Sequence, residues 1–432
     1  MSPIQIVAVA LTVCLNGLDG FDVLAVSFAA PGVAAEFGID RSALGFVLAA
    51  ELIGMGVGSV VLGGLSDRIG RRKTIIGCLI TMSLGMFLAS TAYSVATLAL
   101  WRVFTGIGIG GMLAAITAAA AEHSNKTNRS LCVALSAIGY PLGAVAGGSV
   151  AAWLLSMYDW RIVFSFGGIL TAVFLPLVWF GLPETIAHLC QRQPSNALGH
   201  VNRVLGRMGH AAVETLPAPR RSEFKASTAE LFAPALLRRT LLVTAAYFLH
   251  ISTFYFILKW VPKIVVDMGY VASSAAGVLV WANVGGALGG ILLGAITRRL
   301  PTHVVTIVAL LGGFVMVSVF GAGQTTLLQL SLIAAIAGFF TNAGVVGLYA
   351  IFAEVFPTQV RGAGTGFAIG VGRAGAALSP IIAGFLFDGG FGLQGVAIFM
   401  ASGALLAAVC LFLLRPRDLS GAASEATVAN QT

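Results

Sequence analysis

Two carboxylates, Asp19 and Asp22, lie three residues apart inside the first apolar run of the sequence, residues 4–30. At this spacing the two side chains occupy neighbouring positions on one helix face. The run can cross a bilayer, which needs about 20 apolar residues. Because a charge at the bilayer centre costs about 2.5–3.5 kcal/mol on insertion scales, two acids in such a helix indicate a proton or substrate site. The alternative is that one of them only caps or pairs with a neighbouring helix.

Asp19 and Asp22 are expected to titrate as a pair that holds one proton across the neutral range, since two close carboxylates in a low dielectric do not both ionise readily. Glu51 and Arg102 lie at about the same depth in their own apolar runs as Asp22 does, counted at about 1.5 Å per residue. We hypothesise that Arg102 is held by Asp22 or Glu51 in one state and released when that acid is protonated. A static buried ion pair and direct binding of a substrate carboxylate by Arg102 are the alternatives.

Arg373 lies about 18 Å deep in the eleventh apolar run, near the midplane of a bilayer. A substrate carboxylate is its natural partner there, and backbone carbonyls are the alternative. Flat apolar walls with a few polar groups are typical of a small-molecule site, although aromatic side chains in membrane helices mostly pack or face lipid. His250 would carry a proton or serve only in packing. The side chains expected beside Arg373 and Arg102 in the substrate site are Tyr247, His250, Phe254, Trp281, Asn283, Asn342 and Tyr349.

The composition requires a membrane, because 58% of the 432 residues are hydrophobic and only 10% are charged, against about 25% charged in soluble domains. The 54 glycines fit the close approach of helices in lipid. We predict an all-α membrane protein with twelve transmembrane helices in two pseudo-symmetric six-helix bundles. The apolar runs span residues 4–30, 43–65, 74–93, 96–121, 130–155, 162–182, 239–262, 272–296, 303–322, 326–352, 362–386 and 391–414.

One long polar stretch separates the sixth run from the seventh. The expected parts are a first bundle over 1–183, a central loop over 184–237, a second bundle over 238–415 and a disordered tail over 416–432. Lysine and arginine gather in the loops that follow even-numbered runs and in the tail. The loops after odd-numbered runs hold only Arg41, Arg161 and Lys263. The positive-inside rule therefore places both termini and the central loop in the cytoplasm.

The two halves carry matching pairs of charges at matching turns. Glu122 and Arg129 bracket the turn after the fourth run, and Glu354 and Arg361 bracket the turn after the tenth run at the same spacing. Such an internal duplication is typical of secondary transporters, whose binding site lies near the midplane. The sequence has no phosphate-binding glycine loop, metal-ligand spacing, nucleophile triad or disulfide framework. We therefore expect no cofactor, no metal, no enzyme activity and no nucleic-acid partner, and a monomer in a lipid bilayer.

The loop from Gly63 to Lys73 resembles the signature loop of the major facilitator superfamily, and the stretches Arg102–Gly110 and Glu354–Gly362 resemble two further motifs. Together they cover the whole chain and imply the twelve-helix fold of that superfamily. The copy of this loop in the second half, Gly294–Leu300, has no acid at the position of Asp67. We therefore expect a contact other than an acid–arginine pair to close the cytoplasmic gate on that side. The residues expected to form gating ion pairs at the cytoplasmic face are Asp67, Arg68, Arg71, Arg72, Glu122, Arg129, Glu354 and Arg361.

The motif Leu18-Asp19-Gly20-Phe21-Asp22, followed by Pro31, resembles helix 1 of the aromatic acid/proton symporter family of benzoate, hydroxybenzoate and hydroxyphenylpropionate-type carriers. Lys259-Trp260-Val261-Pro262 and Arg373 fit the same family. The resemblance implies proton-coupled import of a small aromatic carboxylate across a bacterial inner membrane. The alternatives are a carrier of the same fold for another organic acid or a sugar, a drug/proton antiporter, and a membrane sensor. The lack of a recognisable domain in the central loop argues against a sensor.

Overall fold

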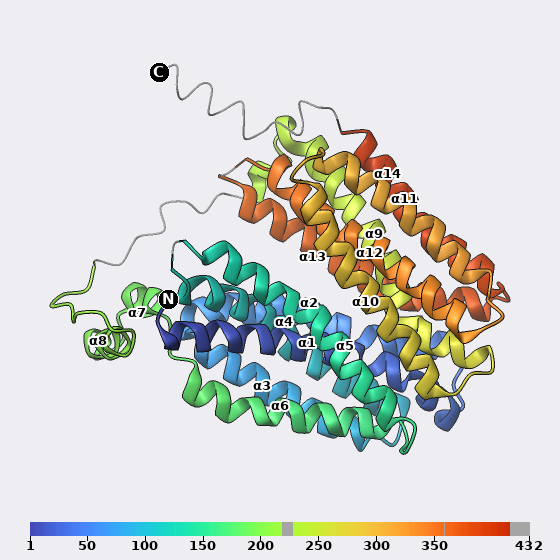
Figure 1. Ribbon diagram of the computed structural model, residues 1–432, viewed down its shortest axis with the longest axis horizontal. Helices are drawn as coiled ribbons and strands as arrows, with labels where there is room; N and C mark the ends of the chain where they lie inside the picture. The colour runs from blue at the N-terminus through green and yellow to red at the C-terminus, as the bar shows by residue number, and fades with distance from the viewer. Residues whose placement is uncertain (126, 218–227, 358, 415–432) are drawn as a thin grey trace. The chain divides into compact units, whose positions relative to one another are not determined.

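The structure, a computed structural model, describes residues 1–414 apart from residues 126, 218–227 and 358 (Figure 1). The tail expected over 416–432 and part of the central loop lie outside the described residues. The helices are α1 (Pro3–Phe37), α2 (Arg41–Ile69), α3 (Arg71–Ser90), α4 (Val95–His123), α5 (Arg129–Leu154), α6 (Arg161–Gly181), α7 (Ile186–Arg192), α8 (Ala197–Arg207), the 3₁₀ turn η1 (Thr228–Phe232), α9 (Pro234–Asp267), α10 (Ala272–Ile296), α11 (Thr302–Gly321), α12 (Leu327–Val355), α13 (Arg361–Asp388) and α14 (Leu393–Phe412).

Twelve helices in the described part of the chain are long and apolar enough to cross a membrane. They confirm the predicted all-α fold with twelve transmembrane helices. Several extend beyond the apolar runs, and α9 has 34 residues, or about 51 Å. A hydrocarbon core is about 30 Å thick. Charged side chains such as Arg238 and Asp267 occupy the additional turns, which is why the hydropathy pattern made the apolar run shorter than the helix.

Contacts divide the chain into two compact units. Unit 1 comprises Met1–Val33 and Ala50–Glu223, and unit 2 comprises Ala34–Ala49 and Phe224–Thr432. Residues 34–49, which include the end of α1 and the start of α2, therefore group with the second half of the chain. The domain boundaries given above from the sequence stay a prediction.

Unit 1 is held together by backbone contacts at glycines as well as by apolar packing of α3 on α4 and α6. In α5, a methyl group on Gly143 would overlap the carbonyl of Gly17 in α1. In α4, a methyl group on Gly106 would overlap the carbonyl of Glu51 in α2. Asn16 Nδ2 donates to the Ser136 carbonyl at 2.6 Å and fixes the rotation of α1 against α5. This close approach buries the acidic face of α1.

Unit 2 repeats part of this packing. Its helix α10 packs on α12, α11 packs on α12 and α14, and α9 packs on α13 and α14. Gly289 of α10 lies against the Phe339 backbone of α12, as Gly58 of α2 lies against the Ile107 backbone of α4. The helix pairs α2–α4 and α10–α12 thus use glycine at matching places in the two halves.

The central loop contains two short helices, α7 and α8, that the hydropathy pattern did not mark. They pack against each other and follow α6 within unit 1 (Figure 1). In α8, Ala197, Val201 and Val204 are buried. Their spacing of three and four residues is that of one helix face, so α8 is amphipathic.

Candidate functional site

A charge cluster of Asp22, Glu51 and Arg102 lies inside unit 1, and all three residues are fully buried. Arg102 Nη2 forms an ion pair with Glu51 Oε1 at 2.6 Å. The same nitrogen donates to the backbone carbonyl of Asp22 at 2.9 Å, and Nη1 lies 2.8 Å from Met86 Sδ. The guanidinium carbon is 5.2 Å from the centroid of the Phe164 ring. Of the two acids hypothesised to hold Arg102, the structure therefore shows the carboxylate of Glu51 and only the backbone of Asp22.

The Asp22 carboxyl accepts a long hydrogen bond from Thr171 Oγ1, at 3.4 Å, through Oδ2. Within the described residues its other oxygen, Oδ1, has no hydrogen-bond partner. The charges that act on this carboxyl are those of Arg102 and Glu51. Two carboxyl groups thus share one guanidinium, and Glu51 has the ion pair.

Asp19 is also buried, with 1% of its surface exposed. It lies close enough to the Cys78 thiol of α3 to act on it electrostatically. Proton exchange by Asp19 and Asp22 as one pair stays a prediction, and Glu51, which was expected at the same depth, acts electrostatically on Asp22.

A tyrosine cluster of Tyr247, Tyr349, Phe352 and Arg373 forms in unit 2. The hydroxyls of Tyr247 and Tyr349 are 3.0 Å apart, and their rings are 5.7 Å apart. The Phe352 ring lies 5.5 Å from that of Tyr247. Arg373 is half-buried and near enough to Tyr247 to interact with it electrostatically. The structure therefore brings three of the residues expected in the substrate site together on α9, α12 and α13.

The polar residues of unit 2 are engaged with backbone carbonyls. Asn342 Nδ2 donates to Gly286 at 2.7 Å, and Asn283 Nδ2 donates to Leu279 at 2.9 Å. His250 Nε2 lies 2.8 Å from the Thr341 carbonyl, and the histidine is fully buried. These contacts fit packing roles, which was the alternative offered for His250.

Phe254 and Trp281 lie apart from this arrangement. Trp281 is 53% exposed, and Phe254 packs edge-on against Tyr255 at 5.5 Å. Their assignment to the substrate site stays a prediction.

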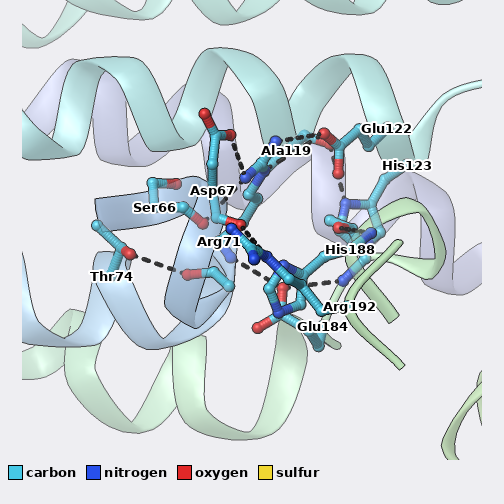
Figure 2. Close-up of polar contacts among 12 residues, drawn as sticks. Ser66, Asp67, Arg71, Thr74, Ala119, Glu122, His123, Glu184, His188 and Arg192 are labelled. Carbon is cyan, nitrogen blue, oxygen red and sulfur yellow. Dashed lines mark hydrogen bonds and ion pairs between the residues drawn. The ribbon is translucent and has the colours of Figure 1, made fainter. Parts of the chain in front are cut away.

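A signature-loop cluster of Asp67, Arg71, Glu122 and Glu184 joins α2, α3, α4 and the end of α6 (Figure 2). Arg71 Nη1 pairs with Asp67 at 2.7 Å, and Nη2 pairs with Glu122 at 3.0 Å. Figure 2 shows the Arg71 side chain reaching towards both acids at once. An arginine fork suits such double contacts, so this residue locks the ends of three helices together.

Glu184 was not among the residues expected here. Its Oε1 accepts from the backbone N–H of Arg71 at 2.9 Å and thereby caps the start of α3, where a carboxylate also stabilises the helix dipole. The φ of +107° at Gly70 lets the chain turn into this cap. The one available signal was an acid directly after an apolar run, at Pro183-Glu184.

The other expected gating residues make fewer contacts. Arg72 lies over the Trp179 ring at 5.1 Å, and Arg361 Nε donates to the Phe356 carbonyl at 3.3 Å. Arg68 and Arg129 are exposed, and Glu354 is half-buried. In the described part of the chain, no group of three or more His, Cys, Asp or Glu residues could hold a metal ion.

Comparison with known proteins gives one consistent family. The sequence profile of the Major Facilitator Superfamily matches residues 12–326 and 306–430. A gallate transporter of Pseudomonas putida is 32% identical, covering 90% of this chain and 88% of that protein. A 3-(3-hydroxy-phenyl)propionate transporter of Escherichia coli (strain K12) is 29% identical, covering 93% of this chain and 91% of that protein.

Among solved structures, a crystal structure of a D-xylose-proton symporter matches with a TM-score of 0.74 and 16% identity, covering 96% of this chain and 98% of that one. At this identity the likeness shows the fold alone. The profile and the relatives confirm the expected superfamily, and with it the expectation that the protein is not an enzyme. The chain, a multi-pass membrane protein, therefore belongs to the major facilitator superfamily.

Proposed function

We propose that this protein imports a small aromatic carboxylate together with protons across a bacterial inner membrane, by alternating access. Relatives at 29–32% identity over most of the chain are named as transporters of gallate and of 3-(3-hydroxy-phenyl)propionate. These names support the substrate class. The distribution of lysine and arginine supports an orientation with both termini in the cytoplasm.

Proton coupling is supported by the charge cluster, in which the acids Asp22 and Glu51 lie near one guanidinium, that of Arg102. Arg102 forms its ion pair with Glu51, and within the described residues the hydrogen-bond partner of the Asp22 carboxyl is the Thr171 hydroxyl. A second carboxylate charge at a fully buried site would be uncompensated, which is costly in a low dielectric. Asp22 is therefore most stable with a proton in this arrangement. Loss of that proton would favour exchange of Arg102 from Glu51 to Asp22, and such an exchange links protonation to a change of helix contacts.

The tyrosine cluster supports binding of an aromatic carboxylate in unit 2. Arg373 supplies the positive charge, and Tyr247, Tyr349 and Phe352 supply rings and hydroxyls. A guanidinium can hold a carboxylate through two parallel hydrogen bonds. One proton per monovalent anion makes transport electroneutral, and each further proton adds about 2.3 kcal/mol per 100 mV of membrane potential.

The signature-loop cluster supports a rigid element at the proposed cytoplasmic face. Asp67, Arg71, Glu122 and Glu184 connect four segments of unit 1 by ion pairs and a helix cap. We propose that this cluster keeps the cytoplasmic ends of α2, α3, α4 and α6 together as one rigid element during transport. It takes no part in binding substrate.

The proposed function is tested with the purified protein in proteoliposomes. Labelled benzoate, hydroxybenzoates, a sugar and a cationic drug are compared by counterflow and under a pH gradient. We expect accumulation of an aromatic acid when the outside is acidic, and loss of that accumulation with a protonophore. Counterflow of a sugar or export of the drug, without transport of any aromatic acid, would overturn the proposal.

A further inference from the structure

A cavity of about 220 Å³ lies in unit 2 away from the tyrosine cluster, at the end of α9. Its buried floor is Trp260, Ile264 and Phe387, which are 1%, 4% and 8% exposed. Phe391 stands at the rim and is 56% exposed. The remaining lining residues are Arg41, Asp267, Met268, Gly392 and Leu393. An engineered cavity of about 150 Å³ holds benzene, so this one has room for a single ring with a carboxylate.

Arg41 is fixed in place at the rim by four contacts. Its guanidinium carbon lies 5.1 Å from the centroid of the Phe387 ring, and Nη2 pairs with Asp267 at 2.9 Å. Its backbone N–H donates to Asp388 Oδ1 at 3.2 Å. A methyl group on Gly384 would overlap its carbonyl region, so α13 packs directly against the start of α2. The side chain is therefore positioned before any ligand arrives, which lowers the entropy lost on binding.

Two donor groups of Arg41 remain available at the rim. Within the described residues, neither Nε nor Nη1 donates to an acceptor, and the side chain is 42% exposed. Each of these nitrogens carries an N–H that can make a charge-assisted hydrogen bond to a carboxylate oxygen.

Two cations and one carboxylate form a network of ion pairs at the cavity. Asp267 is shared by Arg41 and Lys263, each of which pairs with one of its oxygens. These three groups carry one positive charge in excess. Asp388 directs both carboxylate oxygens to the backbone N–H groups of Arg41 and Ser42, where the helix dipole of α2 offsets its charge.

We infer that this cavity is a peripheral binding site for a small monovalent aromatic carboxylate. The ring enters between Phe387, Phe391 and Trp260, and the carboxylate stays at the rim on Nη1 of Arg41. In the orientation proposed above, the site lies at the outer face and captures substrate before it reaches Arg373. The inference rests on the proposed function for the substrate class and for that orientation.

The test measures benzoate binding to the full chain in phosphatidylcholine nanodiscs. The chain carries Arg373→Gln, which removes the cation of the tyrosine cluster. We expect this protein to bind benzoate, and a further Arg41→Gln change to weaken that binding by about tenfold, as loss of a charge-assisted hydrogen bond predicts. Benzylamine should not compete. Phe391→Ala should weaken binding of benzoate more than binding of acetate, and it leaves the ion pairs intact.

Asp267→Asn is the matched control, because it breaks the same ion pair from the other side. If Arg41 binds the ligand, this change frees Nη2 and leaves benzoate binding unchanged or tighter. If Arg41 acts only by pairing with Asp267, the change weakens binding as Arg41→Gln does, and the inference is wrong. It is equally wrong if the Arg373→Gln protein binds no benzoate.

Transport assays separate this inference from the proposed function. If the wild-type protein accumulates no aromatic acid but binding still depends on Arg41, the proposed function fails and the peripheral site stands. If uptake is normal and the half-saturating concentration does not rise in Arg41→Gln, the peripheral site is overturned and the proposed function stands. We expect that concentration to rise severalfold with little change in the maximal rate.

Discussion

Unit 1 buries acids, and the described part of unit 2 buries none. Three carboxylates, Asp19, Asp22 and Glu51, are buried in unit 1 together with one arginine, Arg102. In the described part of unit 2 no aspartate or glutamate is buried, whereas Lys259 is fully buried and Arg373 is half-buried. The helix pairs α2–α4 and α10–α12 nevertheless pack through glycines in the same manner. The two halves thus share a scaffold while their interiors have different electrostatic properties.

This difference fits a division of roles between the halves. A proton site needs a carboxyl group that can bind and release a proton, and a neighbouring cation that stabilises the charged form. An anion site needs positive charge and donors, and a buried carboxylate there would repel the substrate. Unit 1 meets the first requirement at Asp22, and unit 2 meets the second at Arg373.

The largest effects on stability and uptake are expected when the acids Glu51 and Asp22 of the charge cluster are replaced, one in each variant. Glu51→Gln removes the carboxylate that pairs with Arg102, and breaking a buried pair costs about 3–5 kcal/mol. Asp22→Asn leaves that pair intact, so the free energy of unfolding should change much less. Both changes should abolish uptake driven by a pH gradient. Thermal unfolding in nanodiscs and uptake in proteoliposomes measure the two effects.

Counterflow separates proton coupling from substrate binding in these variants. Asp22→Asn protein should still exchange labelled for unlabelled aromatic acid, because Arg373 and the tyrosine cluster are unchanged. Normal accumulation of substrate by Asp22→Asn protein, sensitive to a protonophore, would contradict the assignment of the proton to unit 1. Equal stability of the two variants would contradict the role of Glu51 as the partner of Arg102.

The proximity of these charges follows from simple counting along the sequence. Asp22, Glu51 and Arg102 lie at similar depths because each helix rises by about 1.5 Å per residue. Counting could not decide which acid pairs with Arg102, because that choice depends on helix rotation. The rotation is set by backbone contacts such as Gly106 on Glu51 and Gly143 on Gly17, and no hydropathy pattern reports them.

Other parts of the site were less accessible to sequence reasoning for related reasons. A helix that is apolar on all sides gives no amphipathic signal, so the sequence does not predict which of its faces is buried. Trp281 is 53% exposed, whereas Tyr247 is 4% exposed. Glu184 was missed because its partner is a backbone N–H at the start of α3. Such a partner carries no side-chain signature. Ion pairs between named side chains, such as Arg71 with Asp67, were easier to anticipate.

The second-largest effect is expected when Arg373, the cation of the tyrosine cluster in unit 2, is replaced. Arg373→Gln should raise the half-saturating concentration of the aromatic acid about tenfold or more, since hydrogen bonds to charged groups contribute about 1.5–3 kcal/mol. Arg373→Lys keeps the charge but not the planar fork and should be intermediate. The exposed Arg299 in the same unit is the matched control, and Arg299→Gln should leave uptake unchanged. Equal effects at the two positions would remove Arg373 from the substrate site.

The smallest effect is expected from the paired hydroxyls of unit 2. Tyr349→Phe removes one partner of the 3.0 Å contact with Tyr247 and keeps the ring. One neutral hydrogen bond contributes about 0.5–1.5 kcal/mol, so uptake should fall by no more than about tenfold. If these hydroxyls contact a hydroxyl group on the substrate ring, hydroxybenzoate uptake falls while benzoate uptake is unchanged. Tyr158→Phe, at a side chain that is 60% exposed, is the control. An equal loss for both acids would show that the hydroxyl pair holds the helices together instead, and the substrate contacts of unit 2 would then reduce to Arg373 and the rings.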